Sequence, residues 1–263
     1  MLTVRTGPMM GLIVQVALLA ALAVTVGLGI AGWLAGIAVG AVTCAALTRG
    51  LHRSGAGELG PADRVTLTRA TLVGGVAALT VDSFERHAPV VVLVVLAIVA
   101  LVLDAVDGMV ARRTGTASAL GARFDMEVDA FLVLVLSVYV ARPVGAWVLA
   151  IGAMRYAYVV ATWTLPWMRG TLPPRYWRKI VAATQGVVLV FATGHVLPRP
   201  LMAAALVASL ALLIESFGRD VGWLWNHRLV ESGPAAGSRS GARRDRQIPF
   251  EQRRAQPTGA TIR

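Results

Sequence analysis

Long runs of apolar residues constrain this chain more than any other feature of its sequence. The clearest run, APVVVLVVLAIVALVL, ends immediately before Asp104, and hydrophobic residues make up 56% of the chain at a mean hydropathy of +0.67. About 20 apolar residues in a helix cross the 30 Å hydrocarbon layer, where backbone polar groups must bond to one another. We therefore predict an all-α, polytopic membrane protein.

The apolar runs predict about eight transmembrane helices. They lie near residues 8–30, 32–48, 65–82, 89–110, 117–141, 143–164, 179–196 and 199–217. Cys44 is the single cysteine, which excludes an internal disulfide and a cluster of thiolate zinc ligands.

The distribution of arginine between the connecting segments predicts the orientation. If the N-terminus is cytosolic, the inside segments hold Arg49, Arg53, Arg64, Arg112, Arg113, Arg169, Arg175, Arg178 and Lys179, and the outside segments only Arg86, Arg142 and Arg199. Since cytoplasmic loops are enriched in basic residues, both termini are expected in the cytosol, with the protein in the cell membrane. The preference for arginine, alanine and valine is typical of a GC-rich bacterial gene.

Much of the net charge of +11 lies in the polar segment from residue 231 to residue 263. This segment has too few apolar residues for a core, so we predict a disordered basic tail near anionic lipid headgroups. Nucleic acid is not an expected partner, because no stacking aromatic residues or binding module accompany the arginines.

Four aspartates interrupt the apolar pattern within residues 104–129. Asp104 and Asp107 share a helix face with Gly108 and Ala111, which have little bulk. On the next predicted helix, Gly121, Asp125 and Asp129 recur at intervals of four residues and form one stripe. The connection between the two helices is short, so the helices are antiparallel neighbours and the stripes are expected to face each other near the cytosolic surface.

Converging carboxylates need positive charge among them, and oxygen ligands alone favour Mg²⁺, Mn²⁺ or Ca²⁺ over zinc or copper. The small residues leave room for a bulky ligand, and Arg112 has the guanidinium group that suits phosphate oxygens. The pattern indicates metal-assisted handling of a diphosphate at a membrane surface.

These residues resemble the signature of the CDP-alcohol phosphatidyltransferases. The signature in this chain is Asp104, Asp107, Gly108, Ala111, Arg112, Gly121, Asp125 and Asp129, with every interval of the family pattern. The resemblance implies transfer of a phosphatidyl group from CDP-diacylglycerol to a polar alcohol, with release of CMP. It also implies a homodimer and a Mg²⁺ or Mn²⁺ cofactor.

The roles of the signature residues follow from the same resemblance. Asp104, Asp107 and Asp125 would hold one or two divalent ions, and Asp129 would complete that site and act as the catalytic base. The nucleotide pocket would be shaped by Gly108, Ala111, Arg112 and Gly121. The six-helix family core would occupy residues 57–230, leaving residues 1–50 as two additional helices without an assigned role.

A second resemblance lies at Pro61 to Arg69, where Thr66 and Arg69 match a family pattern but Asp63 replaces its asparagine. Thr66 is a candidate for the nucleotide pocket; the alternative is a helix start in which Asp63 is the cap and Thr66 packs.

Three basic residues are candidates for binding the acceptor alcohol: Arg155, Arg178 and Lys179. A cation inside an apolar span is costly, which favours a role for Arg155, although an ion pair with Asp125 or Glu127 is the alternative. Arg178 and Lys179 are equally compatible with cytosolic anchors. The acceptor remains open between inositol phosphate, glycerol phosphate, serine and other alcohols.

Two other functions are compatible with buried acids in membrane helices. An intramembrane prenyltransferase also binds a diphosphate through magnesium, but typically has two distant aspartate-rich motifs. A transporter can use acids as a proton relay, although its site usually lies near the bilayer midplane within a repeat, and neither feature is evident here.

Overall fold

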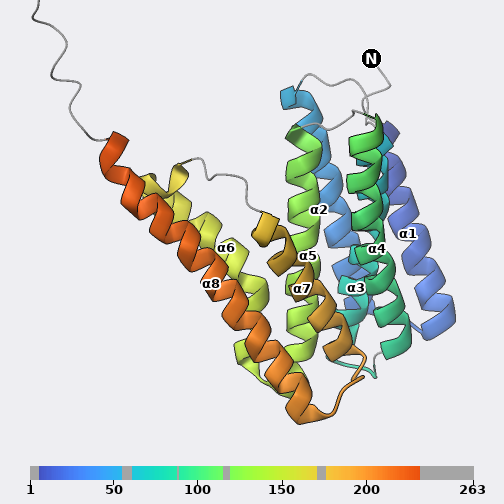
Figure 1. Cartoon of the computed structure of the whole chain (residues 1–263). Coiled ribbons are helices and arrows are strands. Elements are labelled where there is room, and N and C mark those ends of the chain that lie inside the picture. Colours follow the sequence, from blue (N-terminus) through green and yellow to red (C-terminus); the bar gives the residue numbers. More distant parts are fainter. Residues whose placement is uncertain (1–5, 55–60, 88, 115–118, 171–175, 232–263) are drawn as a thin grey trace, which may run out of the picture.

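The computed structural model describes residues 6–54, 61–87, 89–114, 119–170 and 176–231 (Figure 1). These residues form eight α-helices and no strand, as predicted. The helices are α1 (Thr6–Val26), α2 (Ile30–Ser54), α3 (Pro61–Asp82), α4 (Val90–Thr114), α5 (Ala119–Val144), α6 (Leu149–Thr164), α7 (Tyr176–Thr193) and α8 (Arg199–Glu231). Two 3-10 turns flank α6: η2 (Ala146–Val148) and η3 (Pro166–Arg169). The predicted basic tail lies outside the described residues.

Within the described part of the chain, 5 helices are long and apolar enough to cross a membrane. They are α1, α2, α3, α6 together with η2, and α8. The apolar part of α4 is shorter and ends at Val106, where the acidic motif has already begun. Helix α5 carries Arg123 and three acids within its first eleven residues, and α7 carries Arg178 and Lys179 in its first turn. The polytopic membrane class is confirmed.

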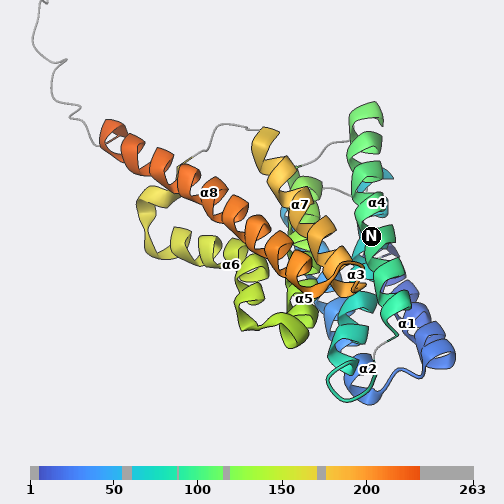
Figure 2. The ribbon, with the colours of Figure 1, turned by 60° about the horizontal axis from the view of Figure 1, so that its bottom comes forward.

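Helix α3 lies at the centre of the bundle and packs against α1, α2, α4 and α5. In its span from Asp63 to Asp82, 72% of the residues are buried. Figures 1 and 2 show α1 to α5 and α7 gathered together, whereas α6 and α8 diverge from them as a tilted pair. The helices alternate in direction, so the described chain begins and ends at the same end of the molecule (Figure 1).

The turn between α1 and α2 is fixed to the far end of α3 by two hydrogen bonds. Gly27 has a φ of 75°, a conformation that glycine adopts without strain. The backbone N–H of Gly29 donates to Asp82 Oδ1 over 2.9 Å, and Arg86 Nη1 donates to the carbonyl oxygen of Gly27 over 3.0 Å. The two additional N-terminal helices are therefore anchored to the first helix of the predicted core.

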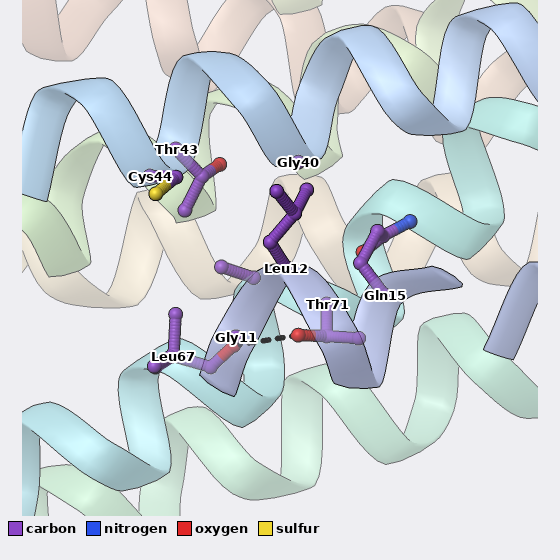
Figure 3. A pocket seen from close by; sticks show the side chains of 9 residues that line it. Gly11, Leu12, Gln15, Gly40, Thr43, Cys44, Leu67 and Thr71 are labelled. Atoms are coloured by element: carbon purple, nitrogen blue, oxygen red, sulfur yellow. Dashed lines mark hydrogen bonds between the residues drawn. The ribbon is translucent and has the colours of Figure 1, made fainter. Parts of the chain in front are cut away.

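A small cavity of about 10 Å³ lies where α1, α2 and α3 meet, lined in part by Gly11, Thr43 and Thr71 (Figure 3). Gln15 of α1 is buried beside it between Gly40 of α2 and Gly74 of α3. Cβ atoms at either glycine would touch the Gln15 side chain, so the glycines allow this polar side chain to enter the interface. A volume of about 10 Å³ is at the lower limit for holding one water molecule.

Helix α8 continues 14 residues beyond its predicted end at residue 217. Its 33 residues make it about 50 Å long, well over the hydrocarbon thickness. The extension packs on η3, where the rings of Trp167 and Trp225 lie edge to face at 5.3 Å and Leu224 is buried. This tertiary packing stabilises the part of α8 that lies beyond the predicted end.

Candidate metal and diphosphate site

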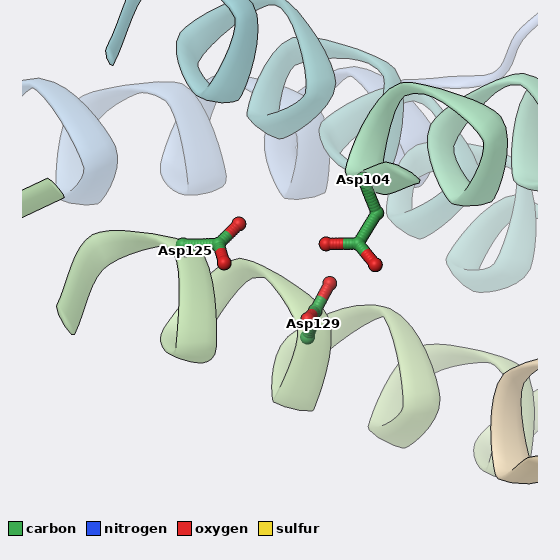
Figure 4. Close-up of side chains that lie close together, drawn as sticks. All are labelled: Asp104, Asp125 and Asp129. Carbon is green, nitrogen blue, oxygen red and sulfur yellow. The ribbon is translucent and has the colours of Figure 1, made fainter. Parts of the chain in front are cut away.

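Three of the four signature aspartates converge at one end of the bundle. Asp104 comes from α4, and Asp125 and Asp129 come from consecutive turns of α5 (Figure 4). One carboxylate oxygen from each lies within 4.8 Å of the others. The interval of four residues places both α5 acids on the face towards α4, as the sequence predicted.

The donor set fits a hard divalent cation. Mg²⁺ holds oxygen ligands at about 2.1 Å, so oxygens on opposite sides of the ion are about 4.2 Å apart. Carboxylate oxygens within 4.8 Å of one another need to move inward only slightly to bind Mg²⁺ or Mn²⁺. The same separation fits the longer bonds from oxygen to Ca²⁺ without movement. Carboxylates alone, without histidine or cysteine, favour these ions over zinc.

An arginine lies among the acids, which sequence reasoning did not foresee. Arg69 of α3 donates from Nη1 to Asp104 and from Nη2 to Asp125, and its Nη2 also lies 3.2 Å from Asp129 Oδ1. The sequence assigns Arg69 only to the second family resemblance. The signal was present, because an arginine inside an apolar helix is as costly as Arg155, and the same argument applied to it.

The remaining signature residues can be assigned to helices α4 and α5. Asp107, Gly108, Ala111 and Arg112 belong to α4, but their side chains lie outside the described part of the structure. Gly121 lies in the first turn of α5, four residues before Asp125, and is partly exposed. Thr66 is buried on α3, three residues before Arg69, so the two residues lie on neighbouring positions of the same face.

The candidate acceptor residues have ion-pair partners in two cases. Arg155 Nη2 lies 2.5 Å from Glu127 Oε1, which links α6 to α5. Arg178 Nε lies 3.0 Å from Asp220 Oδ2, which links α7 to α8. Lys179 is exposed on α7. The pairing with Glu127 matches the ion-pair alternative for Arg155. Glu127 lies two residues along α5 from both Asp125 and Asp129, and therefore on about the opposite face of the helix.

A larger cavity of about 550 Å³ opens between the loops at the opposite end of the bundle. Its lining includes Arg86, Arg142 and His195 and contains no predicted site residue. The convergence of the aspartates is thus independent of this cavity.

Comparison with protein families matches residues 60–214 to the CDP-alcohol phosphatidyltransferases. No curated protein and no solved structure matches the chain. The matched segment covers more than half of the chain and contains α3, which carries Arg69, as well as α4 and α5 with their aspartates. The chain belongs to the CDP-alcohol phosphatidyltransferase family.

Proposed function

We propose that this protein transfers a phosphatidyl group from CDP-diacylglycerol to the hydroxyl group of a polar alcohol and releases CMP. Phosphatidyl transfer in phospholipid synthesis is the activity of its family. The observation that carries the proposal is the convergence of Asp104, Asp125 and Asp129 within 4.8 Å, from two helices that are adjacent in the family segment.

The reaction exchanges one phosphorus–oxygen bond for another. The acceptor oxygen forms a bond to the phosphorus that carries diacylglycerol, the bond from that phosphorus to the CMP oxygen breaks, and CMP leaves with the bonding electrons. Asp129 takes the proton of the acceptor hydroxyl group. A bound Mg²⁺ or Mn²⁺ would neutralise part of the negative charge of the diphosphate.

The other signature residues are assigned by the family pattern. Asp104, Asp107 and Asp125, together with Asp129, hold the cation. The cytidine diphosphate is bound by Gly108, Ala111, Arg112, Gly121 and Thr66. Small residues let the nucleotide approach the backbone, and the guanidinium group of Arg112 donates to phosphate oxygens.

Arg155 is the leading candidate for recognising the acceptor, with Arg178 and Lys179 as further candidates. Arg155 lies on α6, and its ion pair with Glu127 of α5 orients the guanidinium group. A phosphate on the acceptor offers the same kind of bidentate oxygen partner as a carboxylate. We further propose a homodimer in a bacterial cell membrane, with both termini and the aspartates at the cytosolic surface.

The proposal is tested by measuring CMP release from CDP-diacylglycerol with the purified protein and Mg²⁺ or Mn²⁺. The acceptors are inositol phosphate, glycerol 3-phosphate, inositol, glycerol and serine, each in a separate reaction. Asp125→Asn should reduce CMP release to background and abolish stabilisation by the metal, because it removes a charged ligand while keeping the shape of the side chain.

Glu85→Gln is the matched control, because this exposed acid lies at the opposite end of the bundle and should leave both properties unchanged. An Asp125→Asn protein with normal metal binding would remove Asp125 from the site. If the wild-type protein released no CMP with any acceptor of the panel, the proposed reaction would be wrong for these alcohols.

A further inference from the structure

Arg69 is the most completely buried charged group in the described part of the chain, with 0% exposure. It projects from the central helix α3 to both helices that carry the aspartates. Nη1 donates to Asp104 Oδ1 on α4, while Nη2 donates to Asp125 Oδ1 on α5 and to the carbonyl oxygen of Asp125 over 3.2 Å. One guanidinium group therefore joins three helices.

The acids lie between this guanidinium group and the open side of the site. The Arg69 side chain is 1% exposed, whereas those of Asp104, Asp125 and Asp129 are 41%, 34% and 43% exposed. A carboxylate has two oxygens and about four lone-pair positions. Each aspartate that accepts a hydrogen bond from Arg69 therefore keeps lone pairs that can bind a cation. A cation that enters from the exposed side meets carboxylates already held from behind.

Among the described side chains that these ion pairs join, three carboxylates surround one guanidinium group. A divalent cation bound between the carboxylates would reduce their mutual repulsion.

We infer that Arg69 is a positioning residue for the divalent cation, holding the carboxylates of α4 and α5 at converging distance before the cation binds. This inference rests on the proposed function. Groups that orient metal ligands from behind affect metal affinity 10- to 100-fold in other sites, on the order of the effect expected here.

The geometry explains why arginine suits this position better than lysine. The planar guanidinium group presents separate nitrogens in fixed directions, so Nη1 reaches Asp104 while Nη2 reaches Asp125 and Asp129. An ammonium group donates from a single atom on a flexible chain and does not fix the separation of acids on two helices.

The test measures Mn²⁺ affinity of the full-length protein in lipid nanodiscs, by electron paramagnetic resonance of free Mn²⁺. Arg69→Met should weaken binding by about 10- to 100-fold, and Arg69→Lys should fall between Met and the wild type. Arg86→Met is the matched control, because Arg86 bonds to the backbone of the α1–α2 turn at the other end of the bundle. Its Mn²⁺ affinity should equal that of the wild type.

Thermal unfolding with and without Mn²⁺ separates positioning from a purely structural role. Positioning predicts that the Mn²⁺-induced rise in Tm shrinks in the Arg69 variants. A structural role predicts that Tm falls equally with and without Mn²⁺, while the folded protein keeps its Mn²⁺ affinity, and this result would overturn the inference. Tighter Mn²⁺ binding by Arg69→Met would also overturn it, because Arg69 would then compete with the cation.

If Arg69→Met does not fold, Arg69→Lys decides alone, and wild-type affinity in that variant contradicts the inference. Failure of the proposed function is distinguishable: a wild-type protein that binds Mn²⁺ through Arg69-dependent acids but releases no CMP would reject the reaction and leave the positioning role intact. Absence of Mn²⁺ binding by the wild type would reject the metal site and with it this inference.

Discussion

At the scale of single residues, the helical period decides which acids of α5 belong to the site. Asp125 and Asp129 are four residues apart and converge with Asp104, whereas Glu127 lies between them in sequence and pairs with Arg155 of α6. Two residues correspond to about 200° of rotation, so Glu127 faces away from the other two. The spacing therefore assigns Glu127 to an ion pair between helices, and Asp125 and Asp129 to the candidate metal site.

Arg155 offers a prediction at this scale. Arg155→Ala should raise the KM for a phosphorylated acceptor by about 10-fold or more, because a charge-assisted hydrogen bond contributes about 1.5–3 kcal/mol. The KM for an uncharged acceptor should change much less. Steady-state kinetics with inositol phosphate, glycerol 3-phosphate, inositol and glycerol provide the measurement, with Arg199→Ala as an exposed control at the opposite end of the bundle.

Glu127→Gln distinguishes acceptor binding from a role limited to the ion pair. If Arg155 only balances Glu127, the two variants should lower Tm similarly and leave every acceptor KM unaltered. In that case the acceptor role of Arg155 would be wrong.

The sequence predicted the convergence of the aspartates because a fixed period and a short connection determine it. It did not predict the place of Arg69, since Arg69 is separated from Asp104 by 35 residues and from Asp125 by 56. Only the packing of α3 against both α4 and α5 brings these charges together. Hydropathy identifies an arginine in an apolar helix as costly, but it does not identify the partner.

At the scale of helices, a single glycine determines how closely α5 and α6 approach. Gly152 of α6 is buried, and a Cβ atom there would lie 2.5 Å from Leu134 Cα of α5. A backbone atom cannot move aside as the end of a side chain can. Gly152 therefore sets the position of the helix that carries Arg155.

Gly152→Ala should destabilise the protein by about 1–3 kcal/mol, the usual cost of overpacking. Gly218→Ala is the matched control, because nothing lies within 4 Å of a Cβ atom at Gly218. This second variant should be neutral or gain up to about 1 kcal/mol, since alanine favours a helix over glycine. Thermal unfolding of both variants in the same detergent gives the comparison, and equal Tm values would contradict the close contact.

The existence of all eight helices was predictable because each contains a long apolar run. Their ends were less predictable, because they depend on individual contacts. The tilt of α6 away from α5 follows a turn at Gly145, whose φ is 135°, and the extension of α8 depends on its packing against η3. Neither the turn at Gly145 nor the packing of α8 on η3 alters the average hydropathy of its segment.

At the scale of the whole molecule, the aspartates and the larger cavity lie at opposite ends of one bundle. The arginine distribution predicts that the aspartate end is cytosolic. In a Cys44→Ala background, Thr116→Cys should react with a membrane-impermeant maleimide only after cells are opened. Glu85→Cys should react in intact cells, and the reverse labelling pattern would invert the predicted topology.

The central position of α3 also has a consequence for the order in which the chain is made. Proteins are synthesised from the N-terminus, so the helix that bears Arg69 leaves the ribosome before Asp104, 35 residues later, and Asp125, 56 residues later. The arginine must enter the membrane while its acidic partners do not yet exist, at an insertion cost of roughly 2.5–3.5 kcal/mol. By then α1 and α2 are complete, and the backbone N–H of Gly29 and the side chain of Gln15, which packs against Gly74 of α3, are available to receive the arriving helix. The hairpin that precedes the family segment thus gives the nascent α3 a packed protein surface in place of lipid during that interval.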